Sequence, residues 1–236
     1  SAASDVYKRQ MYELGYDQKM KQTDKYTRYG GVSFSYTDGS SSYRSGDGDN
    51  KNKAINFYVT QLGDKGHYLD VVAKINHMDN DFKVFDSNNK KISGDFDNTG
   101  ISLSAEYGRK NSLSQSGWYI EPQAQLTLGY LGGDSYQTSN GITVQQGGIN
   151  SAVGRVGFNL GREIGNQANI YVKANLLHEF GGGYDVTMAD SRGTRFKAAD
   201  TFNDTWFEYG IGVALKTGSN SHIYVDVERS SGSDFK

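Results

Sequence analysis

The fold is decided by residues 117–128, which read Gly-Trp-Tyr-Ile-Glu-Pro-Gln-Ala-Gln-Leu-Thr-Leu. From Ile120 to Leu128 apolar residues occupy every second position, and from Glu121 to Thr127 polar residues occupy the positions between them. Successive side chains of a β-strand point to opposite faces of the sheet. This stretch therefore predicts a strand with one apolar and one polar face.

The same pattern restarts at a regular interval along the chain. A turn-rich stretch is followed by tyrosine, an apolar residue and a charge at 68–70, 119–121, 171–173 and 224–226, and the tyrosines are 51, 52 and 53 residues apart. An interval of this size indicates a repeated supersecondary unit. Each unit holds two strands and two loops of unequal length. Repeated units of this kind form an antiparallel sheet of consecutive hairpins, and closing that sheet into a barrel leaves no exposed edge strand.

Alternating polarity predicts ten strands of about the length that crosses a membrane. They run near residues 11–19, 29–37, 53–62, 68–78, 101–108, 120–128, 155–161, 170–179, 207–214 and 223–228. The predicted fold class is all-β, an antiparallel up-and-down transmembrane β-barrel.

Composition excludes several other classes. The net charge of −2 offers no basic field for nucleic acid, and the absence of cysteine excludes disulfides and thiolate metal sites. No run of eighteen apolar residues predicts a transmembrane helix. Residues 1–10 lack the apolar core of a signal peptide and resemble a translated adaptor scar, so we set them aside and assign residues 11–236 to one barrel domain.

The polar face could point outward, as in a soluble barrel, or inward, as in a membrane barrel. It carries charges of both signs and many glycines, which suits a crowded, hydrated lumen. We expect Gly108, Gly157, Gly210 and Gly212 to admit close aromatic packing from neighbouring strands. The expected lumen-facing charges are Asp70, Lys74, Glu106, Glu121, Arg155, Lys173, Glu208 and Asp226, with Arg155, Lys173 and Lys74 meeting Glu106, Glu121 and Glu208.

Aromatic residues and loop lengths favour the membrane barrel. Tyr68, Trp118, Tyr119, Trp206 and Phe207 lie near strand ends, as interfacial girdles require. Connections alternate along the chain between short and long, which is the outer-membrane pattern with short turns on the periplasmic side. The short ones are 63–66, 110–117, 165–169 and 217–221, and the long polar ones are 37–52, 79–100, 132–150 and 181–203.

Several segments resemble the β-domain of bacterial autotransporters, the type V secretion family. They are residues 63–70, 117–126, 154–157 and 206–212, in the family's order and spacing. The resemblance implies a twelve-stranded barrel in the bacterial outer membrane, of which this chain lacks the first and last strands. It also implies four partners: outer-membrane lipid, an upstream passenger, a linker helix and the outer-membrane assembly machinery.

The leading hypothesis is a translocator that anchors and exports this passenger and is not an enzyme. The alternatives are an outer-membrane adhesin whose loops hold the specificity, and a soluble barrel for a small apolar ligand.

Other motifs favour structural roles over chemistry. Gly133-Asp134-Ser135 resembles a serine esterase block but has no following helix, so we expect a polar turn. Residues 45–50 alternate carboxylates without the glutamate of a calcium loop, so we expect a solvated loop. The four histidines, His67, His77, His178 and His222, show no metal-ligand spacing. We therefore predict no catalytic, cofactor or metal site.

Overall fold

The computed structural model describes residues 5–43, 45–189, 195–202 and 205–234. Within this part the chain forms fifteen β-strands and no helix. Ten long strands are β1 (Asp5–Gln22), β2 (Tyr26–Tyr43), β3 (Gly46–Gly63), β4 (His67–Phe85), β5 (Lys91–Arg109), β7 (Trp118–Leu131), β10 (Ile149–Ile164), β11 (Ala168–Glu179), β14 (Thr205–Lys216) and β15 (Ser221–Asp234). Five short strands are β6 (Asn111–Ser112), β8 (Asp134–Gln137), β9 (Thr143–Gln146), β12 (Gly182–Ala189) and β13 (Arg195–Phe202).

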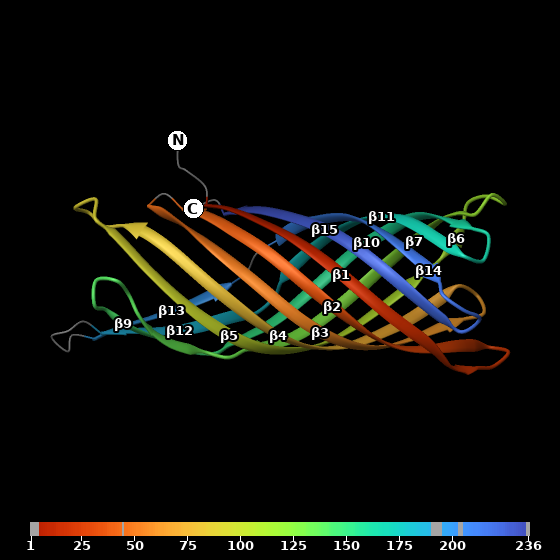
Figure 1. The fold of residues 1–236 in the computed structure, drawn as a ribbon, viewed down its shortest axis with the longest axis horizontal. Helices are drawn as coiled ribbons and strands as arrows, with labels where there is room; N and C mark the ends of the chain where they lie inside the picture. Colours follow the sequence, from red (N-terminus) through yellow and green to blue (C-terminus); the bar gives the residue numbers. More distant parts are fainter. Residues whose placement is uncertain (1–4, 44, 190–194, 203–204, 235–236) are drawn as a thin grey trace.

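The ten long strands close into a barrel. Each pairs antiparallel with its neighbour in the order β1-β2-β3-β4-β5-β7-β10-β11-β14-β15, and β15 pairs with β1 from Asp5↔Asp234 to Gln18↔Ser221. The strands run obliquely around an elongated barrel (Figure 1). The predicted fold class and the ten predicted strands are confirmed, because every predicted stretch lies in one long strand.

Burial in this barrel is the reverse of that in a soluble protein. Large apolar side chains such as Ile101 and Leu103 are more than half exposed on the outer face, whereas Ser33 and Asn56 are at most 2% exposed on the inner face. Soluble proteins bury their large apolar residues instead. We call the outward apolar side chains the outer apolar belt; they include Ile55, Phe57, Val59, Leu69, Val71, Ile75, Ile101, Leu103, Leu126, Leu128, Val156, Phe158, Val172, Leu176, Ile211 and Val225.

Short turns join the strands at one end of the barrel. Gly66 and Gly117 have φ angles of 92° and 97°, which L-residues with a side chain rarely adopt. A Cβ at Gly66 would also press against the backbone oxygen of Lys110, at 2.7 Å. These glycines let the chain reverse within a few residues, as the sequence predicts for 63–66 and 110–117.

The prediction of long loops at 37–52 and 79–100 is wrong, because most of these residues extend the strands. β2 and β3 pair as far as Tyr43↔Gly46, and β4 and β5 as far as Phe85↔Lys91. Beyond the outer apolar belt the outward positions of these strands are polar. In β4 the alternation continues with its faces exchanged, because Phe82 and Val84 point inward whereas Asp81 and Lys83 point outward. The strands therefore continue without the outward apolar residues by which they were predicted.

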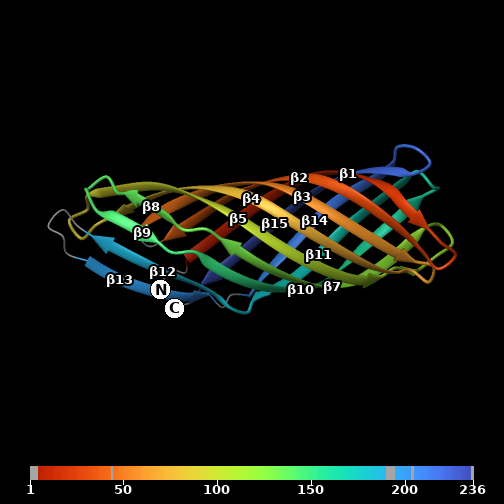
Figure 2. The same ribbon diagram turned by 90° about the horizontal axis from the view of Figure 1, so that it is seen from below.

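The predicted loops 132–150 and 181–203 also contain strands. β9 pairs with β8 and with β12, and β12 pairs with β13, at the end of the barrel opposite the short turns (Figure 2). Gly132 and Asp97 join this segment to β5, since the amide of Gly132 donates to the carbonyl of Thr99 and the amide of Asp97 to Asp134 Oδ2, both at 2.9 Å. Residues 190–194, 203 and 204 lie outside the described residues.

The first residues of the chain contribute to the wall. Residues 5–10, set aside in the sequence analysis, form the start of β1 and pair with both β15 and β2.

No helix in the described part of the chain is long and apolar enough to cross a membrane.

The predicted aromatic girdle holds only in part. Trp118 and Phe207 point outward and are nearly half exposed. Tyr68 and Tyr119 are buried on the inner face, and Trp206 pairs in register with the inward-facing Leu177. Three of the five side chains therefore belong to the lumen, because their strand positions share the parity of the charged residues.

Candidate functional site

The candidate site is the lumen, because the barrel gathers its charged side chains there. The structure places all eight predicted charges on the face opposite the outer apolar belt. They come from seven strands: Asp70 and Lys74 (β4), Glu106 (β5), Glu121 (β7), Arg155 (β10), Lys173 (β11), Glu208 (β14) and Asp226 (β15). Their partners differ in part from those that the sequence predicts.

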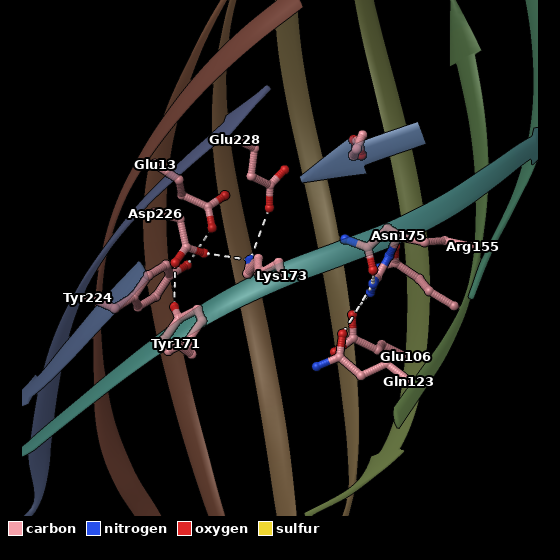
Figure 3. A network of polar contacts seen from close by, with 12 residues as sticks. Glu13, Glu106, Gln123, Arg155, Tyr171, Lys173, Asn175, Tyr224, Asp226 and Glu228 are labelled. Carbon is pink, nitrogen blue, oxygen red and sulfur yellow. Dashed lines mark hydrogen bonds and ion pairs between the residues drawn. The ribbon is translucent and has the colours of Figure 1, made fainter. Parts of the chain in front are cut away.

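Arg155 is the centre of one network (Figure 3). Its guanidinium forms an ion pair with Glu106 across β7, as the sequence analysis expects. It also donates to Gln125 at 2.9 Å, to Gln123 at 3.1 Å and to Asn175 at 2.7 Å. All five donor positions of a guanidinium lie in one plane, so a single arginine can tie together four neighbouring strands.

Lys173 is the centre of a second network (Figure 3). Its Nζ lies 3.0 Å from Asp226 Oδ2 and 2.9 Å from Glu228 Oε1, and the Tyr171 hydroxyl also donates to Asp226. The lysine therefore pairs with carboxylates of β15, on the far side of β14. The predicted contacts with Glu106, Glu121 or Glu208 do not form among the described residues. Glycines at 210 and 212 of β14 leave room for this crossing, because a Cβ at either would overlap the β15 side chains.

The four tyrosines of the sequence repeat share one arrangement. Each lies directly over a glycine in the neighbouring strand, so that a Cβ there would overlap its ring. The hydroxyl then donates to a polar side chain beyond or beside that glycine. The sets are Tyr68 over Gly108 to Glu106, Tyr119 over Gly161 to Asn169, Tyr171 over Gly212 to Asp226, and Tyr224 over Gly15 to Glu13. Tyr58 repeats it over Gly31, with its hydroxyl donating to Asp17 at 2.9 Å.

The predicted role of the inward glycines is therefore confirmed at Gly108 and Gly212 and is wrong at the other two. Gly157 lies against Asn175 and the backbone of Ala174, and Gly210 lies against Glu228 and the backbone of Val227. At each position the lack of a side chain leaves space for a polar residue of one network: Asn175 binds Arg155, and Glu228 binds Lys173.

The remaining predicted charges have neutral or distant partners. Asp70 accepts from the Thr60 hydroxyl at 2.7 Å, and Glu121 accepts from Gln123 at 2.9 Å. Glu208 is the exception, since its Oε2 forms an ion pair with the guanidinium of Arg9 at 3.7 Å. Lys74 forms no hydrogen bond or ion pair with the other residues that the structure describes.

Counting the described side chains on the inner face of the long strands, apart from the exposed rim residues Glu163 and Lys216, gives two unequal sets. The lumen carboxylates are Glu13, Asp17, Asp70, Glu106, Glu121, Glu179, Glu208, Asp226 and Glu228. The lumen bases are Arg9, Lys19, Lys74, Arg155 and Lys173. Glu228 and Glu13 are absent from the eight predicted charges, although both lie on the polar face. Parity alone would have found both.

One group of side chains outside the lumen has the geometry of a cation site. His77 Nε2 lies 3.4 Å from Asp79 Oδ1 and 3.8 Å from Asp97 Oδ2, and its Nδ1 lies 3.1 Å from the Thr99 hydroxyl. All of these side chains are exposed on the outer face of β4 and β5. Histidine spacing did not reveal the group, because Asp97 joins it only through the register of β5 with β4.

The other motifs take structural places. Asp134 and Ser135 begin β8, where the Asp134 carboxylate accepts from the amides of Asp97 and Ser135. The prediction of a solvated loop at residues 45–50 is wrong, since Gly46–Asn50 lie in β3 and pair with β4. Asp47 and Asp49 point outward there, because alternate strand positions share a face.

A closed antiparallel barrel with an apolar outside and a charged lumen defines the class of outer-membrane β-barrels. The family model described as "Autotransporter beta-domain" matches residues 2–228. The chain belongs to this family, and the predicted resemblance and the outer-membrane location are confirmed.

Individual relatives agree with this assignment. The chain is 31% identical over 233 residues to the pertactin autotransporter of Bordetella parapertussis, covering 94% of this chain and 24% of the relative. It is 29% identical to the probable autotransporter YcgV of Escherichia coli, covering 94% and 23%. The chain thus spans about a quarter of the length of these relatives.

Solved structures share the fold. The β-domain of the Bordetella autotransporter BrkA matches with a TM-score of 0.58 and 22% identity, over 96% of this chain and 98% of that one. The translocator domain of NalP from Neisseria meningitidis matches with a TM-score of 0.53 and 10% identity, over 100% and 90%.

Proposed function

We propose that this barrel anchors a passenger, encoded upstream of it in a longer protein, in the outer membrane and serves its export to the cell surface. The observation that carries the proposal is a polar lumen enclosed by a closed wall. A peptide passing through a bilayer leaves its backbone amides without hydrogen-bond partners unless water or protein groups supply them. Charged and amide side chains from at least seven strands supply such groups here.

The lumen side chains would act on the passing chain by hydrogen bonding and charge, with no covalent chemistry. Arg155 and Lys173 form ion pairs with carboxylates two strands away, so their networks stabilise the barrel wall. Lys74 is different, since it forms no hydrogen bond or ion pair with the described residues and is held near Glu13, Glu208 and Glu228 by charge alone. Its ammonium group can therefore turn to a linker helix or to the passenger. Once the assembly machinery releases the barrel into the membrane, the outer apolar belt would contact the acyl chains of the lipids.

The test is surface display from a Gram-negative cell. The chain is fused behind a signal peptide and an epitope-tagged reporter, and intact cells are treated with an external protease. The proposal predicts that the reporter is cleaved in intact cells while the barrel stays in the outer-membrane fraction. A folded barrel in that fraction with an uncleaved, periplasmic reporter would contradict export and would favour the loop-bearing adhesin.

A further inference from the structure

The lumen holds more negative than positive side chains. Nine lumen carboxylates face five lumen bases among the residues whose side chains the structure describes. The exposed rim residues Lys110, Glu163 and Lys216, at the short-turn end, add one negative and two positive charges and still leave an excess of three carboxylates. The imbalance therefore belongs to the interior of the barrel.

Ion pairing neutralises only part of this set. The ion pairs among described residues engage Glu106, Glu208, Asp226 and Glu228 with arginine or lysine. Four other carboxylates are held by uncharged donors instead. These contacts are Glu13 with Tyr224, Asp70 with Thr60, Glu121 with Gln123, and Glu179 with Ser151 and the amide of Ala152. A neutral donor fixes a carboxylate in place without cancelling its charge.

Water reaches the charged groups of the lumen. The side chains of Arg155 and Glu106 keep exposed fractions of 11% and 16%, and those of Lys173 and Glu228 each keep 17%. Fixed charges around a narrow aqueous space with low-dielectric walls focus their field and concentrate counter-ions. Rings of aspartate and glutamate make pores selective for cations in this way.

We infer that the lumen of this barrel is a cation-selective pore. Potassium or sodium ions balance the carboxylates that uncharged donors hold, and chloride is repelled from the same space. The same field favours a passing polypeptide segment that carries lysine or arginine over one that carries aspartate or glutamate. This selectivity is a property of the empty barrel and is independent of passenger export.

The measurement is the reversal potential of the refolded chain in a planar lipid bilayer under a KCl gradient. The expected result is a potassium-to-chloride permeability ratio above one. Asp70→Asn and Glu121→Gln should each move the ratio toward one, and the double variant should move it further, because each removes a charge that no base cancels. Lys74→Gln should raise the ratio, since it removes a positive charge from the lumen.

Asp81→Asn is the matched control, because Asp81 is exposed on the outer face of β4 beyond the apolar belt. Its ratio should equal that of the unaltered chain. Heat-modifiable migration on a gel verifies that each variant is folded before its ratio is compared. A ratio of one or less in the unaltered chain, or the absence of any conductance from a folded barrel, would overturn the inference whatever the variants do.

Discussion

The ring of Tyr119 in β7 lies directly over the backbone of Gly161 in β10, its partner in the strand register. The ring is 3% exposed, and its hydroxyl reaches past the glycine to Asn169 of β11, at 2.7 Å. One side chain thus connects three consecutive strands of the wall. Tyr171 likewise reaches across β14 to Asp226 of β15, whereas Tyr68 and Tyr224 donate to a carboxylate on the strand of the glycine that they cover. The sequence period therefore marks the positions where a tyrosine links its strand to a glycine-bearing neighbour.

Gly161→Ala should destabilise the barrel, because the new methyl group would occupy the space of the Tyr119 ring. Overpacking of this kind costs about 1–3 kcal/mol. The measurement is the free energy of unfolding in detergent micelles by denaturant titration. Gly129→Ala is the matched control on the same inner face, since its nearest contact would be an ordinary 3.4 Å to Ser102. Equal losses in the two variants would show that the tyrosine contact is not the cause.

Tyr119→Phe should cost less, because the ring stays over Gly161 and only the hydrogen bond to Asn169 is lost. Loss of one such bond costs about 1 kcal/mol. Tyr119→Ala should cost about 3–5 kcal/mol, since it also leaves a cavity. Tyr209→Phe, at a side chain that is 47% exposed on the outer face, provides the control for hydroxyl removal. The prediction fails if Tyr119→Phe is as damaging as Tyr119→Ala.

Arg155→Met should destabilise the barrel more than loss of a rim ion pair does. Removal of the arginine leaves the Glu106 carboxylate without its counter-charge in the lumen, which costs about 3 kcal/mol for a buried pair. Lys110→Met is the control, because its pair with Glu163 is exposed at the rim and is worth less than about 1 kcal/mol.

Adding Glu106→Gln to Arg155→Met should recover part of the stability, because it removes the stranded charge. The same denaturant titration measures both variants. An Arg155→Met barrel as stable as Lys110→Met would mean that the lumen solvates Glu106 fully.

Alternation predicted the membrane-facing half of each strand because lipid requires an apolar residue at every second position. It could not predict the extension of β3 or β4 through Lys51 and Asp79, because the outward positions there are polar and no longer mark a lipid-facing strand. The eight charges were assigned to one face by the same parity. Their partners could not be assigned, because contact between Lys173 and Asp226 depends on strand order, register and the glycines of the strand between them.

Leu103→Arg should test the depth of the outer apolar belt. Leu103 is 57% exposed at the middle of the apolar run of β5, so an arginine there would place its charge in hydrocarbon. Lipid-facing arginine near the bilayer midplane costs about 2–4 kcal/mol, falling toward zero at the interface. Folding free energies in lipid vesicles measure the cost, with Asp81→Arg in the neighbouring strand as the control beyond the belt. Because Asp81 faces water in the extended part of β4, its substitution should be nearly neutral. Equal costs at the two positions would place the bilayer elsewhere on the barrel.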